Sequence, residues 1–262
     1  MNRTWPAPPV GGVDEVELDT CDVVEGLKIK AGPLVDVFNL ISLHGGLAES
    51  WPATKITARF VVAALVKHWR KVGLPHFAQF DNDTRFQGPH QYPDTVGRVT
   101  RLCLSLGVVP VFAPPRETGF QASIESFNGR WQEKVWTRFT HDSLRGLRQR
   151  SVDYIEATRS RSAARIEAAP ARRPFPKGWR LDLQVTPHGR IIYLRRTDDR
   201  GRVNLLGHTF AVDSNWTHRL VRAEFDLDRN RIRFYALRRR EPTDQPCLKT
   251  ITHHLPKRRF HE

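Results

Sequence analysis

The sequence has few cysteines and no long apolar run. Its 262 residues hold only three cysteines, Cys21, Cys103 and Cys247, which stand alone and form no Cys-x-x-Cys pair. This argues against a disulfide framework and against a thiolate zinc site. No apolar stretch is long enough to cross a bilayer, and the first residues carry no signal-peptide core. We therefore expect a soluble protein of the cytoplasm that makes no contact with a membrane.

The first half of the chain has almost no excess of charge of either sign. Residues 1–140 contain 15 Lys or Arg and 14 Asp or Glu, whereas residues 141–262 contain 27 and 14. A basic excess favours a polyanionic partner, because each neutralised phosphate releases condensed counterions. A solvated basic surface is the alternative, and charge alone favours nucleic acid only slightly.

Apolar patterning predicts alternating strands and helices over the first two thirds of the chain. Three strands are expected first, as a meander, and two more are expected on either side of a helix. Four segments are predicted to be helices because their apolar residues have helical spacing or because they lack helix breakers. The predicted strands are 13–24, 34–43, 47–51, 76–80 and 108–112, and the predicted helices are 54–73, 95–106, 122–139 and 142–168.

A Pro- and Arg-rich segment, 168–178, reads as a linker, and the pattern changes after it. Short alternating runs separated by turns predict a small all-β domain, which we expect to be a barrel. The expected strands are 181–185, 190–195, 202–206, 208–212, 219–225 and 231–236.

Three acidic residues stand in recognisable local patterns: Asp19 in Leu-Asp-Thr, Asp81 in Phe-Asp-Asn, and Glu125 in Ile-Glu-Ser-Phe-Asn-Gly. The two aspartates fall in or after expected strands, and the glutamate falls on an expected helix, with Asn128 and Gln132 on a neighbouring face. Carboxylates are the ligands that hard divalent cations prefer, and two such ions can clamp the oxygens of an in-line displacement at phosphorus. The pattern indicates a metal site for phosphoryl transfer.

These motifs, in this order, resemble those of the retroviral-integrase type of DDE recombinase, including bacterial insertion-sequence transposases. The resemblance implies an α/β fold: a ribonuclease H-like core with a mixed five-stranded sheet and helices, followed by a small all-β SH3-like barrel. The expected divisions are a Pro-rich lead (1–12), the catalytic core (13–140), a helical extension (141–168), a linker (169–178), a DNA-binding β-barrel (179–252) and a basic tail (253–262).

The resemblance also implies a function. Asp19, Asp81 and Glu125 would bind two Mg²⁺ or Mn²⁺ ions in a polynucleotidyl transferase that cleaves DNA 3′ ends and transfers the strands, as a transposase or integrase does. Double-stranded DNA is the implied partner, with a homodimer or higher oligomer assembled on it in the bacterial cytoplasm, associated with the nucleoid. The residues expected to contact DNA are Arg116, Asn128, Arg130, Gln132, Lys134, Arg172, Arg173, Arg238, Arg239 and Arg240.

Three departures from the family pattern keep alternatives open. The interval between Asp81 and Glu125, 43 residues, is longer than the commonest form, Asp83 stands where the family usually has glycine, and no element-end recognition module is expected in this chain. A truncated or domesticated transposase remnant that only binds DNA is one alternative, and an RNase H-like nuclease is another. The scattered histidines, among them His188, His208 and His253, favour surface or core roles over zinc.

Overall fold

The structure is a computed structural model that describes residues 16–30, 32–89, 92–117, 120–238, 244–256 and 259–260. Contacts divide the chain into two compact units that interleave along the sequence. One unit, here the α4 unit, holds Asp14–His76 and Gln121–Phe175. The other, here the β6 unit, holds Phe77–Phe120 and Pro176–Glu262. Among the described residues, none of the helices is long and apolar enough to span a membrane.

The α4 unit begins with the predicted antiparallel meander. Its strands are β1 (Leu18–Lys28), β2 (Leu34–Ser42) and β3 (Ala48–Ala53), with β2 paired to both neighbours. Helix α1 (Ala58–Val72) follows; it begins where the Thr57 hydroxyl accepts the N–H of Phe60 at 3.2 Å. It ends at Gly73, whose φ of 85° suits glycine. The predicted order of strands and helix is confirmed here.

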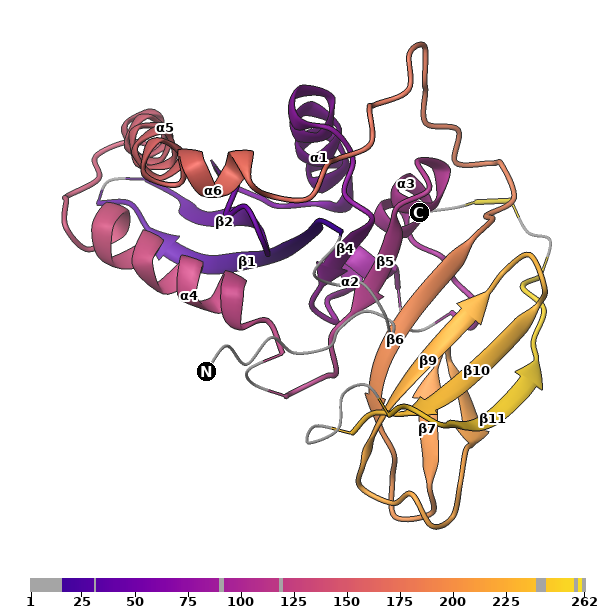
Figure 1. Cartoon of the computed structure of the whole chain (residues 1–262). Helices are drawn as coiled ribbons and strands as arrows, with labels where there is room; N and C mark the ends of the chain where they lie inside the picture. Colours follow the sequence, from indigo (N-terminus) through magenta and orange to yellow (C-terminus); the bar gives the residue numbers. More distant parts are fainter. Residues whose placement is uncertain are drawn as a thin grey trace. The chain divides into compact units, whose positions relative to one another are not determined.

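The second segment of the α4 unit is helical. It comprises α4 (Ala122–Trp131), a π-helical turn (Gln132–Trp136), α5 (Leu144–Arg161) and α6 (Ala163–Glu167). Helix α4 lies along β1 and β2 (Figure 1). Its apolar side chains, including Phe127 and Trp131, pack on Val37 and Ile41 of β2 to form a buried core. This packing explains why the α4 sequence forms a helix with one face against the sheet.

The β6 unit contains a mixed sheet in the order β4-β5-β6-β9-β10-β11. Strands β4 (Phe77–Phe80), β5 (Val109–Phe112) and β6 (Arg190–Arg196) are parallel neighbours, and β9 (Leu220–Asp226), β10 (Arg231–Ala236) and β11 (Cys247–Thr252) continue antiparallel (Figure 1). Helices α2 (Thr84–Gln87) and α3 (Arg98–Ser105) lie between β4 and β5 in sequence, and β7 (Arg202–Leu205) with β8 (His208–Ala211) forms a separate hairpin.

The predicted SH3-like barrel is not confirmed. Strand β6 pairs in parallel with β5, so the β-rich C-terminal segment extends an open sheet, and in the described residues no pairing closes it. The predicted strand 181–185 is wrong, since this segment is irregular. The Arg101 guanidinium donates to the carbonyls of Leu183 and Val185 at 3.0 Å each, so a side chain takes acceptors that a sheet partner would use. The expected domain boundaries stay a prediction.

Candidate functional site

Strand β1 carries one aspartate on each face of the meander. Successive side chains of a strand point to opposite faces, so Asp19 and Asp22 lie on different sides of the sheet. The contacts agree with this: Trp69 of α1 donates a hydrogen bond to Asp19, whereas Asn128 of α4 donates one to Asp22. The sheet therefore separates two carboxylates that have different helical neighbours.

The Asp19 carboxylate is fully buried and held by strong donors. The Trp69 Nε1–H donates to Oδ2 at 2.9 Å. The Arg172 guanidinium donates to both oxygens, from Nη1 to Oδ2 at 3.2 Å and from Nη2 to Oδ1. A bidentate arginine pair of this kind satisfies and neutralises a buried carboxylate. A metal ion could bind Asp19 only after Arg172 moved away.

The pKa values of Asp19 and Glu17, which lie on the same face, shift in opposite directions, and Asp19 stays ionised. Burial alone would raise the pKa of Asp19, but Arg172 and the Trp69 N–H outweigh burial and hold that pKa below its usual value. Burial raises the pKa of Glu17, although Arg172 at 3.5 Å and the Gly45 N–H at 2.9 Å oppose the shift. The positive charge of Arg172 thus outweighs the effect of burial on the pKa of Asp19 but not on the pKa of Glu17.

The Asp22 carboxylate is held by neutral groups on the opposite face. The Asn128 amide donates to Oδ2 at 2.8 Å, and the Val23 N–H donates to Oδ1 at 2.8 Å. The Asn39 amide in turn donates to Asn128 Oδ1 at 2.8 Å, and both asparagines are buried. Buried amides are costly unless they are bonded, so this chain fixes the orientation of the carboxylate. The Asn128 amide and the Val23 N–H are both neutral donors to this carboxylate.

Glu125 lies on α4 one helical turn before Asn128, on the same side of the helix. Its side chain is exposed, while Ile124 and Phe127 beside it are buried against the meander. The α-helix then passes into a π-helical turn, a distortion that is frequent at functional sites. Within the α4 unit, Asn128 therefore links the β1 carboxylate of Asp22 to the helix face that presents Glu125.

Asp81 lies in the β6 unit, directly after β4, and is half-buried. Its Oδ1 accepts the N–H of Asp83 at 2.9 Å. Asp83 caps α2 and forms an ion pair with Arg85 at 2.6 Å, which gives this carboxylate a local structural role. The neighbouring Asn82 accepts a hydrogen bond from Arg195 at 2.8 Å; burial lowers the pKa of Arg195 to about 10, so it stays charged at neutral pH. The membership of Asp81 in a common site stays a prediction.

Three of the residues predicted to contact DNA are engaged inside the α4 unit. Asn128 bonds Asp22, and Arg172 bonds Asp19. The backbone of Arg173 exchanges hydrogen bonds with Leu74 at 2.7 and 3.1 Å. If these three residues contact DNA as predicted, each must do so with atoms that these contacts do not use.

The other predicted DNA contacts are more accessible. Arg116, Arg130 and Lys134 are exposed, Gln132 is half-buried, and Arg238 forms an ion pair with Asp244. Lys134 pairs with the adjacent Glu133 at 2.6 Å, with both side chains largely in solvent. Arg239 and Arg240 lie outside the described residues.

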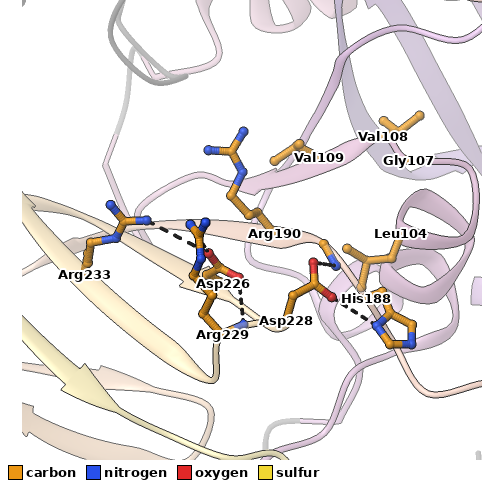
Figure 2. A pocket seen from close by; sticks show the side chains of 11 residues that line it. Leu104, Gly107, Val108, Val109, His188, Arg190, Asp226, Asp228, Arg229 and Arg233 are labelled. Carbon is orange, nitrogen blue, oxygen red and sulfur yellow. Dashed lines mark hydrogen bonds and ion pairs between the residues drawn. The ribbon is translucent and has the colours of Figure 1, made fainter.

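A basic pocket in the β6 unit was not predicted. It has a volume of about 400 Å³ and lies beside β6, β9 and the turn before β10 (Figure 2). Three arginines, Arg190, Arg229 and Arg233, line it with two aspartates, Asp226 and Asp228. Asp226 pairs with Arg229 at 3.4 Å and with Arg233 at 4.0 Å. The alternating arginines of the sequence Arg-Asn-Arg-Ile-Arg, residues 229–233, are the feature from which a basic site could have been predicted. Guanidinium groups in excess over carboxylate here suit a phosphate oxygen.

Comparisons with known proteins give similarity in structure only. No protein-family profile matches the chain, and no curated protein sequence matches it. Among solved structures, a simian T-cell lymphotropic virus intasome in complex with the PP2A regulatory subunit B56 gamma is similar over 84% of this chain and 72% of that chain, with 13% identity and a TM-score of 0.49. The HTLV-2 integrase catalytic core in complex with magnesium is similar over 48% of this chain and 73% of that chain, with 16% identity and a TM-score of 0.37. The BIV integrase catalytic core is similar over 52% of this chain and 81% of that chain, with 16% identity and a TM-score of 0.39.

Proposed function

We propose that the chain is a divalent-metal-dependent polynucleotidyl transferase of the transposase and integrase kind, which cleaves DNA 3′ ends and joins them to target DNA. Its proposed metal carboxylates are Asp22 and Glu125 of the α4 unit, together with Asp81. Asp81 enters the set from the sequence pattern alone. The bacterial insertion-sequence type, double-stranded DNA as partner and a dimer or higher oligomer on DNA belong to the same proposal.

The observation that carries the proposal is the chain of amides from Asn39 through Asn128 to Asp22. It orients a β1 carboxylate on the side of the sheet that faces α4, the helix that presents Glu125. Carboxylate oxygens that are oriented by fixed donors suit Mg²⁺ or Mn²⁺. Two such ions would activate the attacking oxygen and stabilise the leaving oxygen. The Asn128 amide positions the carboxylate oxygens of Asp22 before a metal ion binds.

The residue named by the sequence motif, Asp19, has a different role in this proposal. Its ion pair with Arg172 is buried and saturates both carboxylate oxygens. We assign Asp19 to the stability of the α4 unit, where it joins β1 to α1 and to the segment after α6. If Asp19 were instead the metal ligand, its arginine-bound state would favour the alternative of an inactive, DNA-binding remnant.

The proposal is tested with purified protein, Mn²⁺ and a branched DNA that carries a free 3′-hydroxyl. We expect metal-dependent cleavage and joining by the wild-type chain, and loss of both in Glu125→Gln, which changes only an exposed side chain. Cleavage without joined product would favour the nuclease. DNA binding with neither product at any Mn²⁺ concentration would favour the remnant and contradict the proposal.

A further inference from the structure

Three side chains from distant parts of the sequence meet in the β6 unit. Asp94 precedes α3, His208 opens β8, and His253 directly follows β11. The Asp94 carboxylate lies 3.1 Å from Nε2 of His208 and 2.7 Å from Nε2 of His253. All three potential ligand atoms lie within 4.8 Å of one another. Two imidazole nitrogens and one carboxylate oxygen thus converge on one point.

Backbone hydrogen bonds hold two of the three positions, Asp94 and His253, in place. The Asp94 N–H donates to the carbonyl of Leu206 at 2.9 Å, and the His253 N–H donates to the carbonyl of Asn230 at 2.9 Å. Asp94 has a φ of 61°, a left-handed conformation that aspartate tolerates better than most residues. The protein thus places the carboxylate by an uncommon backbone conformation and a fixed backbone hydrogen bond.

Aromatic rings enclose the cluster on one side. The ring of His253 lies 5.5 Å from that of Phe210 and 5.6 Å from that of Phe225, and 5.2 Å from the ring of His208. The side chains of Asp94 and His253 are each 14% exposed, while that of His208 is 38% exposed. The cluster is therefore walled by apolar groups and open toward solvent near His208.

We propose that Asp94, His208 and His253 bind one Zn²⁺ ion, with water as the fourth ligand. Two neutral imidazoles and a carboxylate are donors that suit a borderline transition ion, and three protein ligands leave one position of a tetrahedron open. Hard Mg²⁺, the ion of the proposed function, prefers oxygen ligands, so the two sites select different metals. The two proposals are independent of each other.

The zinc ion would join the loop before α3, the β7–β8 hairpin and the end of β11. These segments are far apart in sequence, and a ligand that binds only the folded state stabilises it by mass action. The site is hard to recognise in the sequence, because successive ligands are 114 and 45 positions apart and have no Cys partner. A structural role within the β6 unit is the consequence that we infer.

The full chain, freed of any affinity tag and stripped with EDTA, is titrated with ZnCl₂ by calorimetry. We expect one Zn²⁺ per chain with a dissociation constant below about 1 µM, and a rise in the thermal midpoint. Co²⁺ in the same site should give the visible absorption of a four-coordinate ion, which an arrangement of hydrogen bonds alone would not produce. Absence of this band and of zinc binding in the wild-type chain would refute the site.

Variants test the ligand assignment. His208→Ala and His253→Ala should weaken zinc binding about 100-fold or more, whereas His188→Ala should bind as the wild type does. His188 is the matched control because it also pairs with an aspartate of the β6 unit, Asp228 at 3.0 Å, but in an exposed position. Equal loss in all three variants, or none in the first two, would overturn the assignment. Should an alanine variant fail to fold, His208→Gln, which keeps a polar side chain, takes its place.

Discussion

The two faces of strand β1 each carry an aspartate, and the two aspartates differ in burial and in the side chains that bind them. On the α1 face, Asp19 is buried and neutralised by Arg172. On the α4 face, Asp22 is half-buried and oriented by the neutral amide of Asn128. An arginine pair neutralises the charge that would attract a cation, whereas the Asn128 amide is itself neutral and orients the carboxylate. These contacts are the basis for proposing a structural ion pair on one face and a metal ligand on the other.

The largest difference between the faces is expected in catalysis. Asp22→Asn should lower metal-dependent DNA cleavage on the order of 10³-fold or more, because the amide cannot supply an anionic ligand. Its unfolding midpoint should change little, since Asn can still accept the hydrogen bond from Asn128. Gel-based cleavage rates and thermal melts measure the two effects separately.

Asp36→Asn is the matched control for that comparison. Asp36 lies on the neighbouring strand β2, is half-buried, and accepts the N–H of Gly26 at 3.1 Å. It should cleave DNA at the wild-type rate. A comparable loss in both variants would show that any acidic change in the meander reduces activity, and would remove the distinction drawn for Asp22.

The next effect concerns stability on the α1 face. Arg172→Met keeps much of the side-chain volume but leaves Asp19 ionised and buried without its partner, which should cost about 3–5 kcal/mol in the free energy of unfolding. Lys134→Met, which breaks an exposed pair in the same unit, should cost about 1 kcal/mol or less. Denaturant titration measures both. A loss in Arg172→Met no larger than in the control would contradict the structural role of the pair.

A smaller effect is expected from the amide chain. Asn128→Ala removes the donor to Asp22 and leaves the buried Asn39 amide without its acceptor, which should destabilise the protein by about 1–3 kcal/mol. Activity should fall as well, because the carboxylate loses its orientation. Asn128→Asp, which preserves the acceptor for Asn39 but adds a charge beside Asp22, should retain more stability than activity. Full activity in Asn128→Ala would show that the amide does not position a metal ligand.

The smallest effect is a pH dependence that should be confined to the Asp19 face. The folded-state pKa of Asp19 is held below its unfolded value, so its contribution to stability is present above the unfolded pKa, near 4, and is lost as the pH falls through the folded pKa. The stability difference between wild type and Asp19→Asn should therefore shrink as the pH is lowered from 6 toward 3. Denaturant titrations at each pH test this, and a constant difference would argue against an ionised Asp19.

The sequence predicted the meander, helix α1 and the α4 segment because apolar periodicity and breakers such as Gly73 act locally. It failed at 181–185, where Arg101 from another segment satisfies the backbone carbonyls. It also did not foresee that β6 would join β5, because strand pairing across a long interval leaves no local pattern.

At the candidate site, the local motifs directed attention to β1 and α4, but motif spacing does not report which face of a strand a residue occupies. Asp19 and Asp22 differ by an odd number of positions, and the difference follows from the register of β1 with β2 and from partners as distant as Arg172. The basic pocket and the Asp94 cluster were equally inaccessible, since each joins residues from separate elements.

The claim that Asp22 and not Asp19 belongs to the metal site is tested most directly by Mn²⁺ soaked into crystals of the protein and located by its anomalous scattering. We predict a peak within about 2.5 Å of carboxylate oxygens of Asp22 and Glu125, with Arg172 still bound to Asp19. A peak at Asp19 with Arg172 displaced would contradict the account.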